Sequence, residues 1–265
     1  MKTIYYILLP VLAIVTLSYC VGHTTSDENT SDNNGVELPD TTERTSTRST
    51  KQVSPVTIDS STVNGLIVYY PLFSRIDLVC GTMPSTKDTS VIFCAEAAFT
   101  SKIIDEFSHS NINGDHVSAG KLYEGAKCDN SGAFAWLGDT TWEFVHGDYH
   151  ELLERAAKAG GMGFGQMTII QNGKSIRPLW RKGWFHYRAL CEKDGQLCIV
   201  DSRDKVSYER FVANLEEFAP TYALYMDMGS GWNYSWWRDA DGKVHEIHPA
   251  TDSSRYCTNW ITFYK

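Results

Sequence analysis

The sequence predicts an α+β fold, with a mixed, largely antiparallel sheet and packed helices in a single domain. Two short runs rich in β-branched and aromatic residues, 65–70 and 90–95, are bounded by turn residues and have the character of strands. Asn-Gly and Asp-Gly dipeptides at 172–173 and 194–195 follow apolar runs and predict two β-hairpins. Apolar residues recur at helical spacing in two other segments. Hairpin strands combined with a few helices indicate this class.

The first predicted helix follows Asp148. Asp148 and Glu151 have the spacing of a helix cap with a capping-box carboxylate, and glycines at 160 and 161 end the segment. Ser207 is expected to cap a second helix. The apolar positions of the second helix are Phe211, Val212, Leu215, Phe218 and Ala219.

The hairpin around residues 194–195 joins a strand at 185–191 with one at 197–201. Its register places Arg188 opposite Asp201 and Cys191 opposite Cys198. After the second helix, residues 223–226 have the character of a buried strand that ends at Asp227. A carboxylate and a glycine-containing loop therefore stand at the carboxyl end of this strand, where open α/β sheets tend to bind ligands.

Composition excludes some classes of protein. The chain has 265 residues, 42% of them hydrophobic, which is enough for one or two globular domains. Its formal net charge of -8 has the wrong sign for neutralising phosphates over a broad face, so we expect no nucleic-acid partner. Aromatic residues make up 12% of the chain, and such side chains pack cores or stack on sugar rings.

The amino terminus predicts export. Lys2 precedes an apolar stretch at 4–17 that has the length of a signal-peptide core, which gives a predicted signal peptide at 1–19. Residues 17–20 (Leu-Ser-Tyr-Cys) resemble a bacterial lipoprotein box, in which Cys20 becomes the lipidated N-terminus. Ordinary secretion, or an N-terminal anchor with an incidental cysteine, is the alternative. Residues 20–55 are expected to comprise the lipid-anchor cysteine and a disordered linker rich in Ser and Thr. The folded domain is expected at 56–265.

The remaining six cysteines permit up to three disulfides in an oxidising compartment, and their spacing gives no connectivity. Cys191 and Cys198 are expected either to form a bridge or to be two buried free thiols. The sequence has neither a Cys-x-x-Cys pair nor a Cys/His cluster at zinc spacing, so we expect no metal site. It also lacks a nucleotide fingerprint, a P-loop and a nucleophile elbow, and we expect no bound cofactor.

Two carboxylates are the candidate catalytic residues. Glu96 ends a nearly continuous apolar run, where an ionised side chain is costly to bury unless it is paired or used. It is a candidate acid or base, or else a strand-end carboxylate that faces water or pairs with an arginine. Asp227 precedes a turn whose backbone N–H groups are able to converge on an anion, which suits hydrolysis of a charged sugar derivative. The alternative is an Asp that caps its own turn.

Other residues are candidates for substrate binding. Arg188 is able to grip a phosphodiester or carboxylate with its guanidinium, or to pair with Asp201 across the hairpin. His116 is a candidate proton shuttle or orienting donor, although lone loop histidines usually serve neither role. Gln166 follows two glycines that allow a ligand to approach the backbone. The residues expected to line a sugar pocket are Gly229, Ser230, Gly231, Trp232 and Asn233.

The order of these motifs resembles that of the phosphodiester glycosidase family, which includes the mannose 6-phosphate uncovering enzyme. The similarity spans roughly residues 65–265. Residues 96–100 (Glu-Ala-Ala-Phe-Thr) stand in place of the family's Asn-Gly-Gly-Phe-Phe box, Arg188 matches an Arg before Ala, and residues 227–230 match Asp-Gly-Gly-Gly-Ser. The amino-acid sequence of these motifs is similar to that of a lipoprotein branch of the family from gut bacteria of the Bacteroides type. Glu96 and Met228 depart from the family's Asn and Gly.

The resemblance implies an α+β fold and hydrolysis of a sugar 1-phosphodiester in the bacterial cell envelope. Glu96 and Asp227 would share the acid and base or nucleophile roles, and Arg188 with the turn amides would hold the phosphodiester. The alternative is a non-catalytic glycan-binding envelope lipoprotein, whose tryptophan-rich loop at 232–237 stacks on sugars. A structural envelope protein without a small-molecule site is a third interpretation. The expected partners are a sugar phosphodiester or other glycan, and a periplasmic or cell-surface membrane reached only through the lipid anchor.

Overall fold

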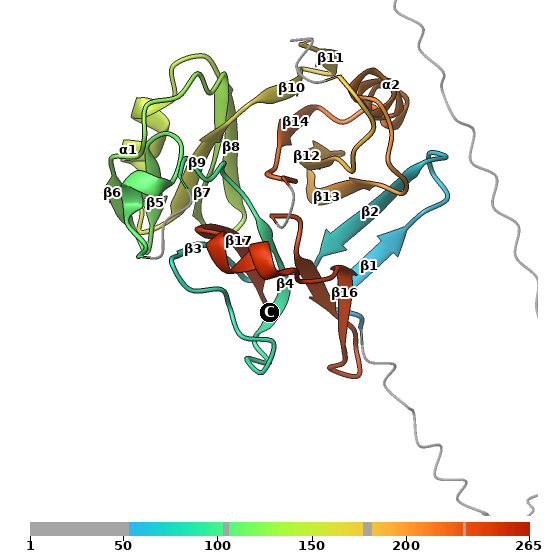
Figure 1. The fold of residues 1–265 in the computed structure, drawn as a ribbon, viewed down its shortest axis with the longest axis horizontal. Helices are drawn as coiled ribbons and strands as arrows, with labels where there is room; N and C mark the ends of the chain where they lie inside the picture. The colour runs from blue at the N-terminus through green and yellow to red at the C-terminus, as the bar shows by residue number, and fades with distance from the viewer. Residues whose placement is uncertain (1–52, 103–105, 177–181, 230–231) are drawn as a thin grey trace, which may run out of the picture. The chain divides into compact units, whose positions relative to one another are not determined.

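The computed structural model describes residues 53–102, 106–176, 182–229 and 232–265 (Figure 1). These belong to one compact unit, Thr50–Lys265. The preceding unit, Met1–Ser49, lies outside the described residues, and so do the predicted signal peptide, Cys20 and most of the predicted linker. Within the described ranges, no helix has the length and apolar character needed to cross a membrane.

The described chain consists mainly of antiparallel strands, so the prediction of an α+β fold with packed helices is wrong. Seventeen strands form three sheets in the described residues, against two α-helices. Both predicted helices are present. Many strands, however, lack a regular alternation of apolar and polar residues, so the sequence does not mark them as strands. One example is β9 (Met162–Gln166), which contains two glycines, and another is β15 (Ser235–Arg238), which the sequence analysis placed in an aromatic loop.

The largest sheet has seven strands in the order β1-β2-β13-β12-β14-β10-β11, all antiparallel. Helix α2 (Tyr208–Phe218) packs against it through Phe211, Leu215 and Phe218, which are buried with the strand side chains. The strands are β1 (Val56–Asp59), β2 (Leu66–Pro71), β10 (Thr168–Gln171), β11 (Lys174–Ser175), β12 (Arg188–Lys193), β13 (Gln196–Ser202) and β14 (Tyr222–Tyr225).

A five-stranded sheet packs against the first, in the order β16-β15-β4-β17-β3. Its central strand, β4 (Val91–Glu96), is buried along its whole length. Phe93 and Phe263 from this sheet share a core with Leu190 and Ile199 from the seven-stranded sheet. The other strands are β3 (Arg75–Cys80), β15, β16 (Val244–His248) and β17 (Asn259–Tyr264), and a 3-10 helix, η2 (Asp252–Tyr256), precedes β17.

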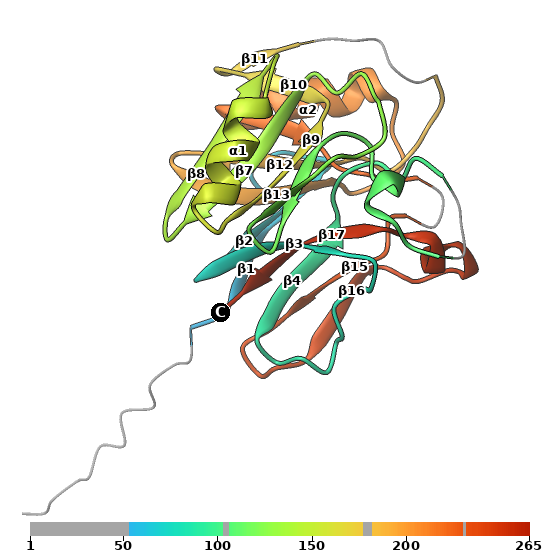
Figure 2. The same cartoon turned by 90° about the vertical axis from the view of Figure 1, so that its left-hand side faces the viewer.

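A second five-stranded sheet has the order β6-β5-β9-β7-β8, and helix α1 (His150–Lys158) lies across it (Figure 2). The glycines of β9 make this close packing possible, because a Cβ at Gly163 would lie 2.7 Å from Leu153 Cδ2 of the helix. The strands are β5 (His116–Ser118), β6 (Lys121–Tyr123), β7 (Gly132–Gly138), β8 (Thr141–His146) and β9, and a 3-10 helix, η1 (His109–Asn111), precedes β5.

The local turn and cap predictions are mostly confirmed. Positive φ angles at Asn172 (51°) and Gly173 (72°), and the same angles at Asp194 and Gly195, form the two tight turns that join β10 to β11 and β12 to β13. The Ser207 hydroxyl accepts a hydrogen bond from the N–H of Arg210, three residues on, as an N-cap does. The predicted cap of α1 is wrong in detail, because its N-cap residue is Tyr149, which makes no side-chain cap bond.

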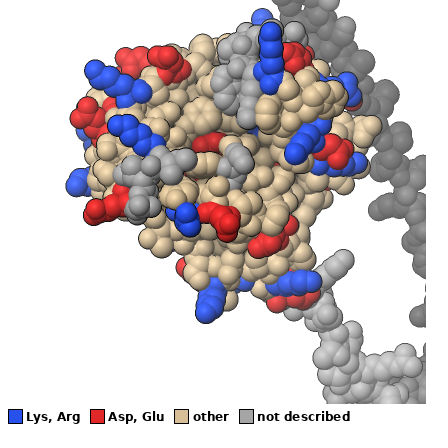
Figure 3. Space-filling model, in the orientation of Figure 1, with Lys and Arg blue, Asp and Glu red and all other residues tan. Residues whose placement is uncertain are grey.

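The predicted hairpin register is confirmed, with Arg188 paired with Asp201 and Cys191 paired with Cys198. Both cysteines are buried free thiols, as is Cys94, whereas Cys80 and Cys128 are half-buried free thiols. Charged side chains of both signs are interspersed on the face shown in Figure 3.

Candidate active site

Glu96 ends the central strand β4, and its side chain is completely buried. Its Oε1 atom accepts hydrogen bonds from the Thr100 hydroxyl at 3.2 Å and from the backbone N–H of Thr258 at 3.4 Å. Its Oε2 atom is buried and has no hydrogen-bond partner among the described residues. Burial raises the pKa of Glu96 well above its ordinary value, and the charge of Asp227 raises it further. Glu96 therefore keeps its proton to a higher pH than an exposed glutamate does.

Asp227 lies two residues beyond β14 and is 7% exposed. Its backbone N–H donates to the carbonyl of Ala97 at 3.0 Å, so the chain after β14 runs beside the chain after β4. Its Oδ1 atom accepts the N–H of Gly229 at 2.9 Å, which is the bond of an Asp that caps its own turn. Its Oδ2 atom accepts the N–H of Thr100 at 3.4 Å. The turn bond therefore occupies one oxygen while the other faces the segment that follows Glu96.

Thr100 brings the two carboxyl groups together. Its backbone N–H donates to Asp227 and its hydroxyl donates to Glu96, so the two acids lie on either side of one residue. The Thr100 hydroxyl also lies 2.8 Å from that of Thr258. Neither threonine is among the candidates predicted from the sequence, although Thr100 follows Glu96 by four residues and ends the box at 96–100.

Two amide side chains hold the segment between Glu96 and Thr100. Asn259 accepts the N–H of Ala98 at 2.8 Å and donates to its carbonyl at 2.9 Å. Gln166, which the sequence analysis named as an extra candidate, is completely buried and donates to the carbonyl of Ala97 at 3.5 Å. Such bonds fix the backbone that joins the two acids, as a preorganised site requires.

Arg188 is committed to a buried ion pair. Its Nε and Nη2 atoms donate to the two carboxylate oxygens of Asp201, each at 2.6 Å, and Nη2 also donates to the Ser235 hydroxyl at 2.7 Å. Burial acts to raise the pKa of Asp201, but Arg188 and His248 outweigh it and hold that pKa below its ordinary value. The pairing with Asp201 that the sequence left open is therefore present. These guanidinium bonds go to Asp201 and Ser235, and the Nη1 atom is buried without a hydrogen-bond partner among the described residues.

The ion pair adjoins a small cavity, which Asp201 helps to line. Asp201 Oδ2 lies 3.5 Å from Nε2 of His248, and both residues line a cavity of about 160 Å³. Two larger hollows, of about 540 and 560 Å³, are lined by other residues and by neither Glu96 nor Asp227. The acid pair is buried just where the chain leaves β4 and β14, which belong to two different sheets.

The predicted sugar-binding loop is only partly described, since Ser230 and Gly231 lie outside the described residues. Gly229 accepts the N–H of Trp232 at 2.9 Å, which closes a turn directly after Asp227. Trp232 is half-buried against the core, and Asn233 is half-buried beside it. Further along, Trp236 is completely buried in β15, where it packs in the core.

His116 belongs to a different cluster. It is completely buried at the start of β5, and its ring is hydrogen-bonded to His109 and to the carbonyl of Gly114. Burial lowers the pKa of His116 to about 4, so the ring is neutral near pH 7. The structure therefore brings Glu96 and Asp227 together and places Arg188 and His116 in two other polar clusters.

The geometry of the acid pair suits acid and base chemistry. When two carboxyl groups interact in a buried place, one keeps its proton while the other ionises. Glu96 is the more deeply buried of the two, and its raised pKa favours the protonated form of this member of the pair. Such a pair supplies a general acid together with a base or nucleophile.

Together these features describe a domain of antiparallel sheets with a buried pair of carboxyl groups at the ends of two strands, and solved structures share this fold. The chain superimposes on the catalytic domain of zebrafish N-acetylglucosamine-1-phosphodiester alpha-N-acetylglucosaminidase, in a form auto-inhibited by its pro-peptide, with a TM-score of 0.54 and 9% identity. The match covers 80% of this chain and 83% of that one. The chain therefore has a structural neighbour in the family that the motif order resembles, although the observed fold is richer in strands than the α+β fold expected from that resemblance.

A hypothetical protein from Synechocystis is also similar, with a TM-score of 0.52 and 12% identity. That match covers 79% of this chain and 61% of the other, so this chain spans less than two thirds of that neighbour. No protein-family model and no curated protein sequence matches the chain. At these identities the likeness is one of fold.

Proposed function

We propose that this protein is a hydrolase of the phosphodiester glycosidase type, which cleaves the bond between a sugar and a phosphodiester at the sugar's C1. The observation that supports this most is the meeting of Glu96 and Asp227 at Thr100, within a fold shared with a catalytic domain of that activity. Glu96 donates a proton to the departing phosphoryl oxygen, and Asp227 acts as base or nucleophile.

Arg188 takes a different part in this proposal from the one that the motif order implies. Its bonds to Asp201 and Ser235 tie β12 to β13 and to β15, so it supports the frame of the site. Because Asp227 follows β14, which pairs with β12, the ion pair helps to position the aspartate. Arg188 is therefore a positioning residue.

The test measures hydrolysis of a panel of aryl-linked and nucleotide-linked sugar 1-phosphodiesters. Asp227→Asn and Glu96→Gln are expected to lower kcat by about 10²–10⁴-fold, the usual contribution of a positioned acid or base. Glu143→Gln is the matched control, because Glu143 is a carboxylate on the surface strand β8, and it should leave kcat unchanged. The pH profile adds a second readout, since the alkaline limb that reports Glu96 should disappear in Glu96→Gln.

A wild-type chain that cleaves none of the panel would overturn the hydrolase proposal. Binding of the same sugars by wild type and by Asp227→Asn with similar affinity would then favour the glycan-binding alternative. Its support is the half-buried Trp232 beside the acid pair, where an aromatic ring is able to stack on a sugar.

We further propose that the domain acts in the envelope of a bacterium, tethered through lipidated Cys20 and the linker that follows it. The support is the sequence pattern of residues 1–55, which lies almost wholly outside the described residues. Incorporation of labelled palmitate into the wild-type chain and its loss in Cys20→Ala would test this. Equal labelling of the two chains would contradict it.

A further inference from the structure

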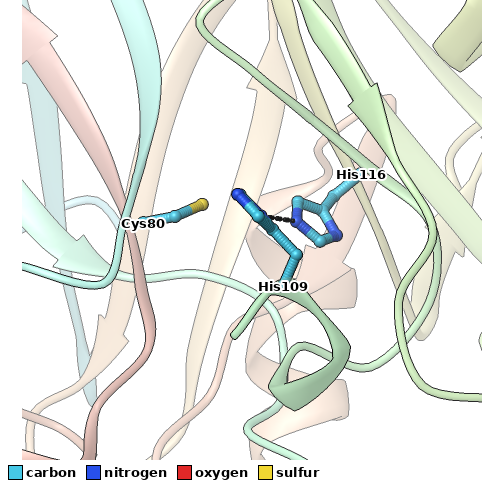
Figure 4. Close-up of side chains that lie close together, drawn as sticks. All are labelled: Cys80, His109 and His116. Atoms are coloured by element: carbon cyan, nitrogen blue, oxygen red, sulfur yellow. Dashed lines mark hydrogen bonds between the residues drawn. The ribbon is translucent and has the colours of Figure 1, made fainter. Parts of the chain in front are cut away.

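Three potential metal ligands from separate elements meet at one point. Cys80 ends β3, His109 begins η1 and His116 begins β5, and one ligand atom from each lies within 4.8 Å of the other two. Figure 4 shows the His109 ring between the Cys80 sulfur and the His116 ring. We infer that these three side chains form a binding site for a transition-metal ion of the zinc class. The inference does not depend on the proposed hydrolase activity.

The distances between the ligand atoms suit such an ion. Nitrogen and sulfur atoms that bind one zinc ion tetrahedrally lie about 3.3–3.6 Å apart, as bond lengths of about 2.0–2.3 Å require. Nδ1 of His109 and Nε2 of His116 are 2.9 Å apart, and the cluster as a whole lies within 4.8 Å. Side-chain movements of about an ångström therefore convert the cluster into a coordination site.

The His116 ring is already oriented as a ligand. Its Nδ1 atom lies 3.2 Å from the carbonyl oxygen of Gly114, and a carbonyl only accepts, so Nδ1 bears the hydrogen. The lone pair is then on Nε2, which faces His109. Metal-bound histidines usually donate their second ring N–H to a carbonyl or carboxylate in this way. Gly114 has a φ of 80°, a conformation that favours glycine, so the turn that presents this carbonyl is itself specified.

Aromatic rings restrain His109. Tyr123 stacks on it with ring centroids 3.4 Å apart and an interplanar angle of 11°, and Phe107 packs edge-on at 5.2 Å. A ligand whose ring is held in place loses less conformational entropy on binding a metal. Cys80 and His109 are half-buried, which gives an ion access to the cluster.

The ligand chemistry selects the ion. One thiolate and two imidazoles suit Zn²⁺ and its neighbours, whereas Ca²⁺ and Mg²⁺ prefer oxygen ligands. On binding, the Cys80 thiol gives its proton to solvent and the thiolate forms the bond to the metal. Within the described ranges only these three residues form such a group, so a solvent molecule completes four-coordination.

The position of the cluster gives the ion a structural consequence. β3 belongs to the sheet that contains β4, and β5 belongs to the sheet beneath α1, so one ion would join the two sheets. Between the two histidines, Ile112 pairs with Thr100, the residue that joins Glu96 and Asp227. The ion would therefore stabilise the segment that packs against the acid pair.

Metal binding is tested on the full chain, produced without an affinity tag and treated with a chelator. Calorimetric titration with Zn²⁺ should give one site per chain, and Co²⁺ should give a thiolate-to-metal absorption band. Cys80→Ser should abolish the band and weaken Zn²⁺ binding by at least about tenfold. Cys128→Ser is the matched control, because Cys128 is also half-buried and lies outside the cluster, and it should keep both signals.

A second measurement uses only the wild-type chain, in case Cys80→Ser does not fold. Alkylation followed by peptide mass mapping should show that Zn²⁺ slows modification of Cys80 at least about tenfold and leaves that of Cys128 unchanged. Absence of saturable Zn²⁺ binding, equal binding by Cys80→Ser, or equal alkylation of Cys80 with and without Zn²⁺ would each overturn the proposal.

Discussion

Breaking the Arg188–Asp201 pair should destabilise the fold far more than breaking a similar pair on the surface. Both side chains are buried, at 0% and 2% exposed, and two hydrogen bonds of 2.6 Å join them. Asp201→Asn leaves the guanidinium charge buried without its counter-charge, which costs about 3–5 kcal/mol. A domain of this size loses about 2–4 °C in Tm per kcal/mol, so the expected fall is about 6–20 °C.

The matched control is the Arg155–Glu143 pair, which also has two hydrogen bonds but lies on the surface, with side chains 44% and 38% exposed. Glu143→Gln should cost about 0–1 kcal/mol. Urea unfolding at pH 7 compares the two variants. Equal losses of stability would refute the reasoning, because they would mean that burial adds nothing to the pair.

The pH dependence of the same pair gives a second check. The folded-state pKa of Asp201 lies below its ordinary value of 3.8, so its stabilising effect is present above that value and is lost as pH falls through the folded pKa. The difference between wild type and Asp201→Asn should therefore shrink in acid. A difference that stays constant down to the acid-unfolding range would contradict the assignment.

Three further predictions follow from burial and packing. The folded-state pKa of Glu96 lies above its unfolded value of 4.5, so the free energy of unfolding of wild type should fall relative to that of Glu96→Gln as pH rises above 4.5. The fall should be about 1.4 kcal/mol for each pH unit that separates the two pKa values. A difference in urea unfolding that does not change with pH would contradict this. Cys191 and Cys198 are free and buried, so both should be alkylated after denaturation without reductant but not in the folded chain, and a mass spectrum that shows them bridged would exclude the assignment. Gly163→Ala forces a Cβ toward Leu153 and should cost about 1–3 kcal/mol, and a Tm equal to that of wild type would disprove the tight packing of α1 on β9.

Short-range features of this chain are largely predictable from sequence. The Asn172-Gly173 and Asp194-Gly195 turns require positive φ, and the register of the second hairpin follows from its two-residue turn. The capping of α2 by Ser207 follows from the hydroxyl that precedes an amphipathic segment. In each case the relevant bonds lie within a few residues.

The sheet-rich architecture was not predictable in the same way, because its strands are specified by packing across the sheets. Gly163 and Gly165 weaken the strand pattern of β9, yet they are needed where α1 approaches, with a Cβ at Gly165 falling 2.5 Å from the Tyr149 hydroxyl oxygen. In β15, Trp236 is buried by its neighbours β4 and β16, and nothing in the local sequence distinguishes this burial from a loop.

The candidate site was predictable only as single residues. Glu96 was identifiable because a carboxylate at the end of an apolar strand is costly, and Asp227 because it begins a glycine turn. Their meeting depends on Thr100 and on the pairing of segments far apart in the chain. The cluster of Cys80, His109 and His116 depends in the same way on β3 and β5 packing together. The spacing of these residues along the sequence therefore does not match a zinc motif.

The most direct test of the acid pair is a titration of Glu96 by carboxyl NMR in wild type, assigned by the signal that Glu96→Gln removes. We expect the pKa of Glu96 to lie well above 4.5 in wild type and to be lower in Asp227→Asn, where the neighbouring charge is gone. A Glu96 that titrates like an exposed glutamate, or that does not respond to Asp227→Asn, would contradict it.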